Sequence, residues 1–317
     1  MKIMVTDNDH ANMNQEDAVF QAAGLSYSMV QCKTEEDLIR ECKGAEILLN
    51  QYAPITRKVM EALRPELKQV VRYGVGVNNV DVPAATELGV QICNVPDYGM
   101  NEVADHALAM LMALTRKVCL MNRYTREKWD YTHSIPIHRI PGSTFGIVCM
   151  GRIAQTLAKR LKGFDCRIIS YDPYIPAEFV PEGVEMVSLD KLIRESDFIS
   201  VHCPLNDDTY NMFNLETFKK MKNNAYIVNT ARGGIINEND LFVALSKGYI
   251  AGAGLDVVEK EPMTPESRLF ELDNFLCTPH MAWYSEEAAE ELKRKTAEEA
   301  VRYAKGEKIK YPINKVD

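Results

Sequence analysis

Residues 145–154 read FGIVCMGRIA, and this stretch decides the fold. An apolar, strand-like run leads here into a helical pattern, which is the setting in which a G-x-G-x-x-G/A motif indicates dinucleotide binding. Gly151 stands at the second glycine, where the backbone can approach a pyrophosphate, and Ala154 is acceptable at the third. We therefore expect Gly151, Arg152 and Ile153 to contact a nucleotide cofactor, with a plain strand-to-helix turn as the alternative.

The motif departs from its pattern at one position, because Cys149 stands where the first glycine belongs. That glycine normally makes the tight turn between the strand and the helix. The exchange therefore either distorts the turn or weakens the affinity for the cofactor. The sequence leaves both alternatives open.

Asp172 lies 21 residues beyond Gly151, at the end of the strand-like run 167–171. A carboxylate at this place can accept hydrogen bonds from a ribose diol, and the same carboxylate repels a 2'-phosphate. A turn initiated by Asp172 and Pro173 is the alternative explanation. The position favours NAD over NADP as the cofactor.

Short β-branched runs alternate with amphipathic stretches along the chain, which predicts parallel β-α-β units. In the first part of the chain we expect strands at 2–6, 27–31, 46–49, 69–73 and 91–95, and helices near 14–23, 35–42, 56–62 and 82–88. A second series of strands is expected at 144–149, 167–171, 198–202, 225–229, 250–255 and 275–277. The fold class is therefore α/β, with two doubly wound parallel sheets.

Two longer helices are expected outside these series. Residues 101–123 predict one continuous helix with Asn101 as its N-cap and an apolar side that includes Leu111 and Leu114. Residues 286–303 predict a final helix rich in Glu and Lys. The polar face of that helix is most simply a solvated surface.

Charge and hydropathy exclude several partners. The 317 residues carry 37 Lys and Arg against 45 Asp and Glu, a formal net charge of −8 at pH 7. A negative chain repels the phosphate backbone, so direct binding of nucleic acid is not expected. No apolar run approaches the roughly 20 residues that span a bilayer, and the start MKIMVTD lacks a secretory pattern. We expect a cytoplasmic protein with no membrane partner.

The eight cysteines are scattered and form no C-x-x-C pair. Six of them lie within or beside apolar runs, which favours reduced, buried thiols over a disulfide framework or a zinc site. No metal site is therefore expected.

Several motifs occur in a characteristic order. They are NTARGG at 229–234, GAGLDV at 252–257, EKEP at 259–262 and TPH at 278–280, preceded by RYGVGVNNVD at 72–81. Together they resemble the D-2-hydroxyacid dehydrogenase family. The run MAWYS at 281–285 makes the chain most similar to the C-terminal-binding-protein branch of that family.

The chemistry of this family can be read from three residues. Reduction of a 2-keto acid needs a fixed cation for the carboxylate and carbonyl, and an acid for the developing alkoxide. Arg232 carries a planar, permanently charged fork, and His280 can serve as the acid or, in the reverse direction, as the base. Glu261 would bind the other ring nitrogen and favour the imidazolium. The resemblance implies the same catalytic set.

Each of these residues also has a structural explanation. An arginine after a strand is often a surface ion-pair partner, a glutamate near a proline often lies in a solvated loop, and His280 could cap the last helix. Their joint occurrence in this order at strand ends favours the catalytic interpretation. Glu261 is preferred over Glu259 because it directly precedes the proline in the family pattern.

The resemblance implies further contacts. The backbone amides of Val75 and Gly76 would hold the substrate carboxylate. Trp283 would lie on the same side of a helical turn as His280 and shape a side-chain pocket suited to an apolar 2-keto acid. The remaining cofactor contacts are expected from Thr230, from Asp256 to the nicotinamide amide, and from Cys203 and Pro204 along the adenosine pocket. Asp256 as a buried structural acid and Pro204 as a plain strand end are the alternatives.

The resulting hypothesis is an NAD-dependent oxidoreductase that interconverts a 2-keto acid and a D-2-hydroxy acid. The resemblance implies a flavodoxin-like substrate-binding domain of residues 1–100 and 283–317, a Rossmann NAD-binding domain of residues 101–282, a cleft between them, and a homodimer. One alternative is an NAD(H)-sensing scaffold with incidental or no turnover, which the exchange at Cys149 motivates. An inactive relative is the other.

Overall fold

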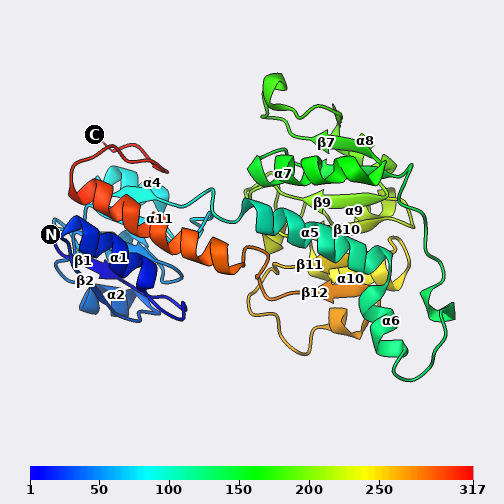
Figure 1. Cartoon of the computed structure of the whole chain (residues 1–317), viewed down its shortest axis with the longest axis horizontal. Coiled ribbons are helices and arrows are strands. Elements are labelled where there is room, and N and C mark those ends of the chain that lie inside the picture. Colours follow the sequence, from blue (N-terminus) through cyan, green and yellow to red (C-terminus); the bar gives the residue numbers. More distant parts are fainter. Residues whose placement is uncertain (317) are drawn as a thin grey trace. The chain divides into compact units, whose positions relative to one another are not determined.

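The computed structural model describes residues 1–316, which form two compact units. One unit combines Met1–Gly99 with Ser285–Asp317, and the other is Met100–Tyr284. The sequence-based boundaries, after residue 100 and after residue 282, fall within two residues of these. Each unit is built around its own parallel sheet (Figure 1), which confirms the predicted α/β class with two such sheets.

In the unit that contains both chain ends, the strand order is β2-β1-β3-β4-β5, the order of a flavodoxin-like sheet. The apolar strands are typical of a parallel sheet, whose two faces are both covered. The strands are β1 (Ile3–Val5), β2 (Tyr27–Met29), β3 (Ile47–Asn50), β4 (Gln69–Arg72) and β5 (Gln91–Cys93). The helices that connect them are α1 (Asn14–Ala23), α2 (Glu35–Glu41), α3 (Arg57–Ala62) and α4 (Val82–Glu87).

Local capping residues determine where three of these helices begin. Thr34 caps α2 in a reciprocal capping box with Asp37. The side chains of Thr56 and Asp81 accept backbone N–H groups in the first turns of α3 and α4. Because each cap satisfies a donor that has no partner inside the helix, the starts are fixed locally. The observed starts lie within one residue of the predicted ones.

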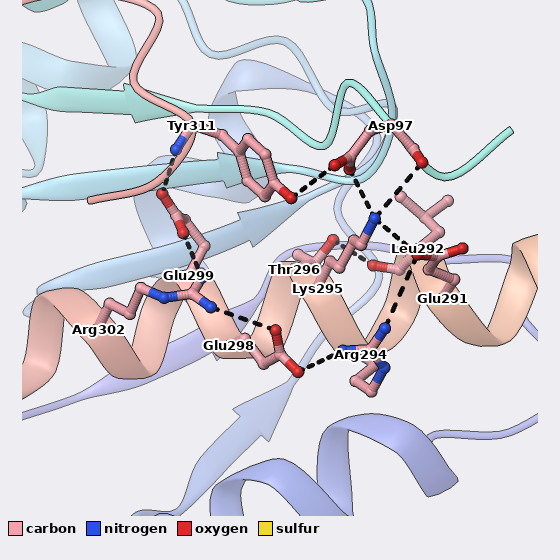
Figure 2. Close-up of polar contacts among 10 residues, drawn as sticks. All are labelled: Asp97, Glu291, Leu292, Arg294, Lys295, Thr296, Glu298, Glu299, Arg302 and Tyr311. Atoms are coloured by element: carbon pink, nitrogen blue, oxygen red, sulfur yellow. Dashed lines mark hydrogen bonds and ion pairs between the residues drawn. The ribbon is translucent and has the colours of Figure 1, made fainter. Parts of the chain in front are cut away.

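The last helix, α11 (Glu286–Ala304), packs on α1, β3 and β4 of the same unit. The predicted solvated polar face is wrong in part, because Lys293, Lys295 and Glu299 are buried. Figure 2 shows that the charges of two of them are paired: the Lys295 ammonium lies 2.7 Å from Oδ1 of Asp97, and Glu299 lies 2.6 Å from a guanidinium nitrogen of Arg302. Asp97 comes from a distant part of the chain, so the composition of the helix could not reveal it.

The segment that follows α11 returns to the sheet and covers its edge. Oε1 of Glu299 accepts hydrogen bonds from the N–H groups of Lys310 and Tyr311 at 2.7 and 2.8 Å. Oδ1 of Asn314 accepts the N–H of Ile92 in β5 at 2.7 Å. Covering an edge strand in this way pairs backbone groups that would otherwise be open to another chain.

The sheet of the other unit has the order β12-β11-β10-β9-β6-β7-β8. The order reverses between β6 and β9, and in doubly wound sheets ligands bind outside the carboxyl ends of the strands at such a reversal. The strands are β6 (Thr144–Val148), β7 (Arg167–Tyr171), β8 (Val184–Met186), β9 (Phe198–Val201), β10 (Tyr226–Asn229), β11 (Gly252–Leu255) and β12 (Phe275–Cys277). The second predicted series is confirmed, although the sequence missed β8, a short strand at the sheet edge with no buried residue.

The helices of this unit are α5 (Met100–Thr115), α6 (Val118–Tyr124), α7 (Arg152–Leu161), α8 (Leu189–Glu195), α9 (Leu215–Lys220) and α10 (Glu238–Ser246). Among all the helices described in residues 1–316, none is both long enough and apolar enough to cross a bilayer.

The single helix predicted over residues 101–123 is wrong. α5 ends at Thr115 and α6 begins at Val118, with Lys117 between them in the left-handed region at φ 53°. α5 buries an apolar stripe that includes Leu111 and Leu114 and packs on β10 and β11, whereas none of the described α6 residues is buried. The helix is interrupted where its stripe no longer has a sheet to cover.

The N-cap predicted at Asn101 is also wrong, because α5 begins one residue earlier, at Met100. The Asn101 side chain instead accepts a hydrogen bond from the Arg160 guanidinium of α7 at 3.1 Å. α5 and α7 pack against each other. This amide therefore serves a contact between helices and not a helix start.

Candidate active site

The loop that carries Arg232 follows β10 and is held closely against a second loop. Asn229, the last residue of β10, accepts a hydrogen bond from the loop backbone at 2.9 Å and donates one to the Arg232 carbonyl at 2.8 Å. A Cβ on Gly233 would lie 1.9 Å from the carbonyl carbon of Val258. Glycine is therefore required at 233, and its close approach brings Arg232 beside the loop that carries Glu261.

Glu261 and His280 form a hydrogen-bonded pair. Nδ1 of His280 donates to Oε2 of Glu261 at 2.7 Å, and the Val258 N–H donates to Oε1 at 3.3 Å. Burial alone would raise the pKa of Glu261, but the hydrogen bonds from His280 and Val258 and the charge of Arg232 outweigh burial and lower it. The carboxylate is thus held ionised beside the imidazole, and Nε2 is the ring nitrogen that can exchange a proton with a ligand.

Glu261, and not its neighbour Glu259, contacts the histidine. The Glu259 carboxylate accepts a hydrogen bond from the Tyr210 hydroxyl at 3.4 Å. Arg232, Glu261 and His280 therefore come together in one unit, each on a loop that follows a different strand of the same parallel sheet. A site at the carboxyl edge of such a sheet is the expected place for a ligand.

His280 lies in a left-handed turn, at φ 52°, that Asp256 anchors. The His280 N–H donates to the Asp256 carbonyl at 2.8 Å. The Asp256 carboxylate accepts the N–H groups of Met281 and Ala282 at 3.0 and 2.9 Å. This backbone conformation costs a non-glycine residue roughly 1–2 kcal/mol. These hydrogen bonds therefore stabilise a turn that is locally unfavourable.

His106 and Thr278 extend this anchor, and no role of either side chain was predicted from the sequence. The Thr278 hydroxyl donates to Oδ1 of Asp256 at 2.6 Å and therefore accepts from Nε2 of His106, on α5, at 2.9 Å. Asp256 is only 2% exposed. Its carboxylate binds three protein donors, which is the role of the structural acid considered as the alternative. Contact of Asp256 with a nicotinamide amide stays a prediction. No local sequence signal marks His106, because only the packing of α5 brings it to Thr278.

The turn from β6 into α7 fits a pyrophosphate. Gly151 is the N-cap of α7, and a Cβ built on it would meet no described atom within 4 Å, so its backbone faces open space. Because the N-cap residue is a glycine, no N-cap side chain accepts the first N–H groups of this helix. The unpaired N–H groups and the positive end of the helix dipole favour an anion here. Arg152 and Ile153 form the first positions of this turn.

Thr230, directly after β10, provides a second observation that fits a dinucleotide. Its Oγ1 is buried, yet it has no hydrogen-bond partner within residues 1–316. A buried hydroxyl without a partner is unfavourable, so a ligand that bonds to it is stabilised. In contrast, no group of three or more His, Cys, Asp or Glu side chains in the described chain is placed to hold a metal ion.

Asp172 organises the loop beside this helix start. Its Oδ2 accepts the Met150 N–H at 2.8 Å, and its Oδ1 accepts the Tyr174 N–H at 2.8 Å. The Asp-Pro turn considered as the alternative is therefore present. Oδ1 also accepts the Ile175 N–H at 3.1 Å, whereas Oδ2 has one donor and can accept a second hydrogen bond, so the turn and a ribose contact are compatible. The ribose contact stays a prediction.

Cys149 and Cys203 follow the adjacent strands β6 and β9. Cys149 has φ 66°, the conformation that glycine favours, so the tight turn is retained despite the exchange. Cys203 is 2% exposed, and the next residue, Pro204, is exposed. Both positions lie at the reversal of strand order, where the fold predicts the nucleotide.

Val75 and Gly76 belong to the other unit, in the loop after β4. Gly74 begins this loop at φ 130°, and a Cβ there would overlap the Arg72 guanidinium, so only glycine fits. The Asn94 side chain donates to the Val75 carbonyl at 2.7 Å and orients the loop. Binding of a carboxylate by the amides of Val75 and Gly76 stays a prediction.

Trp283 lies in the same unit as His280, and its ring packs edge-on against Tyr284 with 5.5 Å between ring centroids. The helical turn predicted to relate it to His280 is wrong. The Tyr284 N–H bonds to the Met281 carbonyl in a tight turn, and α11 begins only at Glu286. A role in a substrate pocket stays a prediction.

A family model, curated relatives and solved structures are similar to this chain. Residues 108–282 match the family model described as D-isomer specific 2-hydroxyacid dehydrogenase, NAD binding domain. The chain is 41% identical to a glyoxylate reductase of Korarchaeum cryptofilum over 85% of this chain and 82% of that protein. The crystal structure of D-lactate dehydrogenase from Aquifex aeolicus complexed with NAD and lactic acid is similar, with a TM-score of 0.85 and 26% identity over 96% of both chains. The prediction of NAD as cofactor is confirmed.

A further relative differs in length. The chain is 36% identical to a D-3-phosphoglycerate dehydrogenase of Archaeoglobus fulgidus over 92% of this chain, but it spans only 55% of that protein. Both relatives and the solved structure carry names of oxidoreductases that act on 2-hydroxy or 2-keto acids.

Proposed function

Because the chain belongs to the D-isomer specific 2-hydroxyacid dehydrogenase family, we propose that it is an NAD-dependent oxidoreductase interconverting a 2-keto acid and a D-2-hydroxy acid. The observation that supports this most directly is the 2.7 Å hydrogen bond between His280 and Glu261, with Arg232 close enough to act on the Glu261 charge. A fixed cation, an acid-base imidazole and its carboxylate partner are the groups that this reaction needs.

In this mechanism NAD, when bound, supplies or accepts the hydride. The Arg232 guanidinium binds the substrate carboxylate and the carbonyl oxygen, which orients the ketone and stabilises the charge that develops on its oxygen. In reduction, Nε2 of protonated His280 donates a proton to that oxygen, and in oxidation the neutral ring accepts the hydroxyl proton. Glu261, bound to Nδ1, fixes the ring orientation and stabilises the imidazolium.

The residues that would hold the cofactor surround the carboxyl ends of β6, β7, β9, β10 and β11. The start of α7 provides amides and a positive dipole for the pyrophosphate, and Asp172 provides an acceptor for the ribose. The orphaned Thr230 hydroxyl offers a further hydrogen bond. The proposed contacts are Gly151, Arg152, Ile153, Asp172, Cys203, Pro204, Thr230 and Asp256.

For the substrate we propose that Val75 and Gly76 hold the carboxylate through their amides, and that Trp283 shapes the side-chain pocket. An indole ring favours an apolar or small substituent over a phosphate. The names of the relatives suggest one small 2-keto acid and one phosphorylated one, and Trp283 favours the unphosphorylated class.

Steady-state oxidation of NADH with a panel of 2-keto acids tests the proposal. The panel contains glyoxylate, pyruvate, a branched-chain 2-keto acid and 3-phosphohydroxypyruvate. We expect turnover with an unphosphorylated acid and, in Arg232→Ala, a loss of about 100-fold or more in kcat/KM with an unchanged Kd for NADH. Arg194→Ala is the control, because Arg194 is an exposed residue paired with Asp190.

Two results would count against this function. Absence of turnover with every acid contradicts the enzyme. Loss of NADH binding together with activity in Arg232→Ala shows that the residue holds the fold and does not bind substrate.

An NAD(H)-sensing scaffold similar to the C-terminal-binding proteins is the second candidate. Cys149 at the first glycine of the motif and the run at 281–285 favour it. A scaffold has no physical need for the hydrogen-bonded Glu261 and His280 pair. An NADH-dependent change in sedimentation without turnover would support the scaffold. Absence of both the sedimentation change and turnover would indicate an inactive relative.

We also infer a homodimer formed through the unit that binds NAD. Its segment after α5 carries Val118, Trp129, Tyr131 and Ile135, which are 57%, 92%, 73% and 61% exposed. Large apolar side chains grouped on one exposed segment mark an interaction surface. A second copy related by a two-fold axis covers the same segment on both chains.

A further inference from the structure

Two cysteines lie together at the place where the sheet order reverses. Val148, at the end of β6, pairs in register with Val201, at the end of β9, and the His202 N–H donates to the Val148 carbonyl at 3.0 Å. Cys149 and Cys203 therefore leave the sheet at the same edge, from neighbouring strands. Such strands lie about 4.8 Å apart, which is within the Cα separation that a disulfide spans.

The two thiols lie close to each other. Cys203 is a buried member of the apolar cluster of this unit, and Cys149 is partly buried and packs against the same cluster. The interaction with Cys203, with burial added, raises the pKa of Cys149, and the interaction with Cys149 lowers the pKa of Cys203. The two thiols therefore lose their protons in steps that belong to the pair.

A second pair of neighbouring cysteines provides a contrast. Cys32 and Cys42 also lie in one apolar cluster, but this cluster is the core of the other unit and the two side chains are 3% and 0% exposed. Burial raises the pKa of Cys32, and it raises that of Cys42 to about 12. Those thiols stay protonated and shielded, whereas Cys149 is partly exposed and gives a small oxidant access to its pair.

We propose that Cys149 and Cys203 form a reversible disulfide that controls cofactor binding, with a hydroperoxide as the oxidant. In the first step one thiol attacks the O–O bond of hydrogen peroxide, which leaves a sulfenic acid and one water. In the second step the other thiol attacks the sulfenic sulfur, the S–S bond forms and a second water leaves. The two thiols lose two electrons and two protons, and a dithiol reductant restores them.

The disulfide acts on the turn that receives the nucleotide. The Cys149 N–H donates to the Tyr171 carbonyl at 2.7 Å, and the next N–H, of Met150, donates to Asp172 at 2.8 Å. A covalent bond from this turn to Cys203 bridges the ends of β6 and β9, between which a dinucleotide lies in this fold. Oxidation therefore weakens NAD(H) binding. By linkage, bound NADH opposes oxidation by the same factor.

The test oxidises the full-length protein with hydrogen peroxide in the absence and presence of saturating NADH. We expect the intact mass to fall by two hydrogens and peptide mapping to join Cys149 to Cys203. The Kd for NADH, measured by fluorescence titration, should rise at least tenfold and return after dithiothreitol. Saturating NADH should slow formation of the disulfide.

Variants separate this mechanism from general oxidative damage. Cys149→Gly places glycine at φ 66°, which glycine adopts readily, so this variant folds. Its Kd for NADH should be the same before and after peroxide, and Cys203→Ser should be equally insensitive. Cys42→Ala is the control and should respond as the unmodified protein does.

Three results would overturn the proposal. They are the failure of peroxide to join Cys149 to Cys203, an unchanged Kd for NADH once the disulfide has formed, and a peroxide-induced loss of binding in Cys149→Gly equal to that of the unmodified protein. None of these readouts depends on turnover, so they stand whether or not the proposed dehydrogenase reaction is correct.

Discussion

The Thr278 hydroxyl group stabilises the loop that carries His280, the proposed acid-base residue. Thr278 donates to the buried Asp256 carboxylate and accepts from His106. Asp256 in turn accepts the backbone N–H groups of Met281 and Ala282, next to His280. Because a buried carboxylate is tolerated only when its oxygens are hydrogen bonded, these groups depend on one another. Thr278 and His106 are therefore positioning residues for His280.

Thr278→Val tests this dependence, because it removes both hydrogen bonds and nearly keeps the volume. We expect the free energy of unfolding to fall by about 1–3 kcal/mol. Kcat should fall more than KM rises, since a displaced His280 impairs proton transfer more than binding. Thr156→Val is the control, because the exposed Thr156 hydroxyl bonds to the Arg152 carbonyl of its own helix. Equal effects in the two variants would contradict the positioning role.

His202 gives the cofactor-binding unit a dependence on pH. Its Nε2 lies 2.8 Å from the Ser200 hydroxyl, and burial lowers the pKa of His202 from 6.5 to about 4. Between these two values the unfolded chain binds a proton that the folded chain does not. The contribution of His202 to stability is therefore constant above pH 6.5 and is lost as the pH falls from 6.5 toward 4.

Urea denaturation of the wild type and of His202→Gln near pH 7 and near pH 4.5 measures this contribution. Carboxylates titrate in both proteins, so only the difference between them reports the histidine. We expect the wild type to lose more free energy of unfolding on acidification, by at most about 3 kcal/mol. The same loss in both proteins would show that His202 is not buried in its neutral form.

α11 shows how the position of a charge in the fold decides its role. Glu299 is fully buried, and it binds the Arg302 guanidinium of its own helix and the N–H group of Tyr311 (Figure 2). It also accepts the N–H of Lys310. It therefore ties the segment after the helix to the helix itself. Removal of the Glu299 carboxylate leaves the two N–H groups without this acceptor, while Arg302 keeps its ion pair with Glu298 at 3.3 Å.

Glu299→Ala should lower the free energy of unfolding by about 2–4 kcal/mol, since it leaves the N–H groups of Lys310 and Tyr311 without this acceptor and removes one of the two carboxylate partners of Arg302. Hydrogen exchange should also become faster at the amides of residues 310–314. Glu290→Ala is the matched control on the same helix, because Glu290 is exposed and should change stability by less than about 0.5 kcal/mol. A similar small effect at Glu299 would mean that the tail is held by its contacts to β5.

The break between α5 and α6 marks the end of the surface that α5 covers. Leu114 is the last leucine of the buried stripe, and Lys117 takes the left-handed conformation three residues later. A helix in a globular protein draws most of its stability from the face that it buries. The apolar side chains beyond the break therefore need another surface.

The exposed segment after α5 predicts how whole molecules associate. Trp129→Glu combined with Tyr131→Glu should convert the dimer to a monomer, because charges on both copies would be buried in the interface. Size-exclusion chromatography with light scattering measures the mass. Phe179→Glu is the control, since Phe179 is 60% exposed elsewhere in the same unit. A monomeric wild type, or a double variant that stays dimeric, would contradict the homodimer.

The order of strands in each sheet belongs to the whole molecule and could not be read from the chain. Periodicity located nearly every strand, because alternation and apolar runs are local features. It did not find β8, whose three residues are half-buried or exposed and carry little signal. It also could not place β6 beside β9, since neighbours in a doubly wound sheet need not be neighbours in sequence.

The sequence by itself determined the two α/β sheets, most helix starts, and the presence of Arg232, Glu261 and His280 at strand ends, because periods, caps and motifs are local. Only the tertiary structure decided that Glu261 binds His280, that His106 supports the same loop, that α11 buries its charges, and that Cys149 meets Cys203. Each of these depends on contacts between segments far apart in the chain. Such contacts are fixed by burial and packing, which no local pattern of residues encodes.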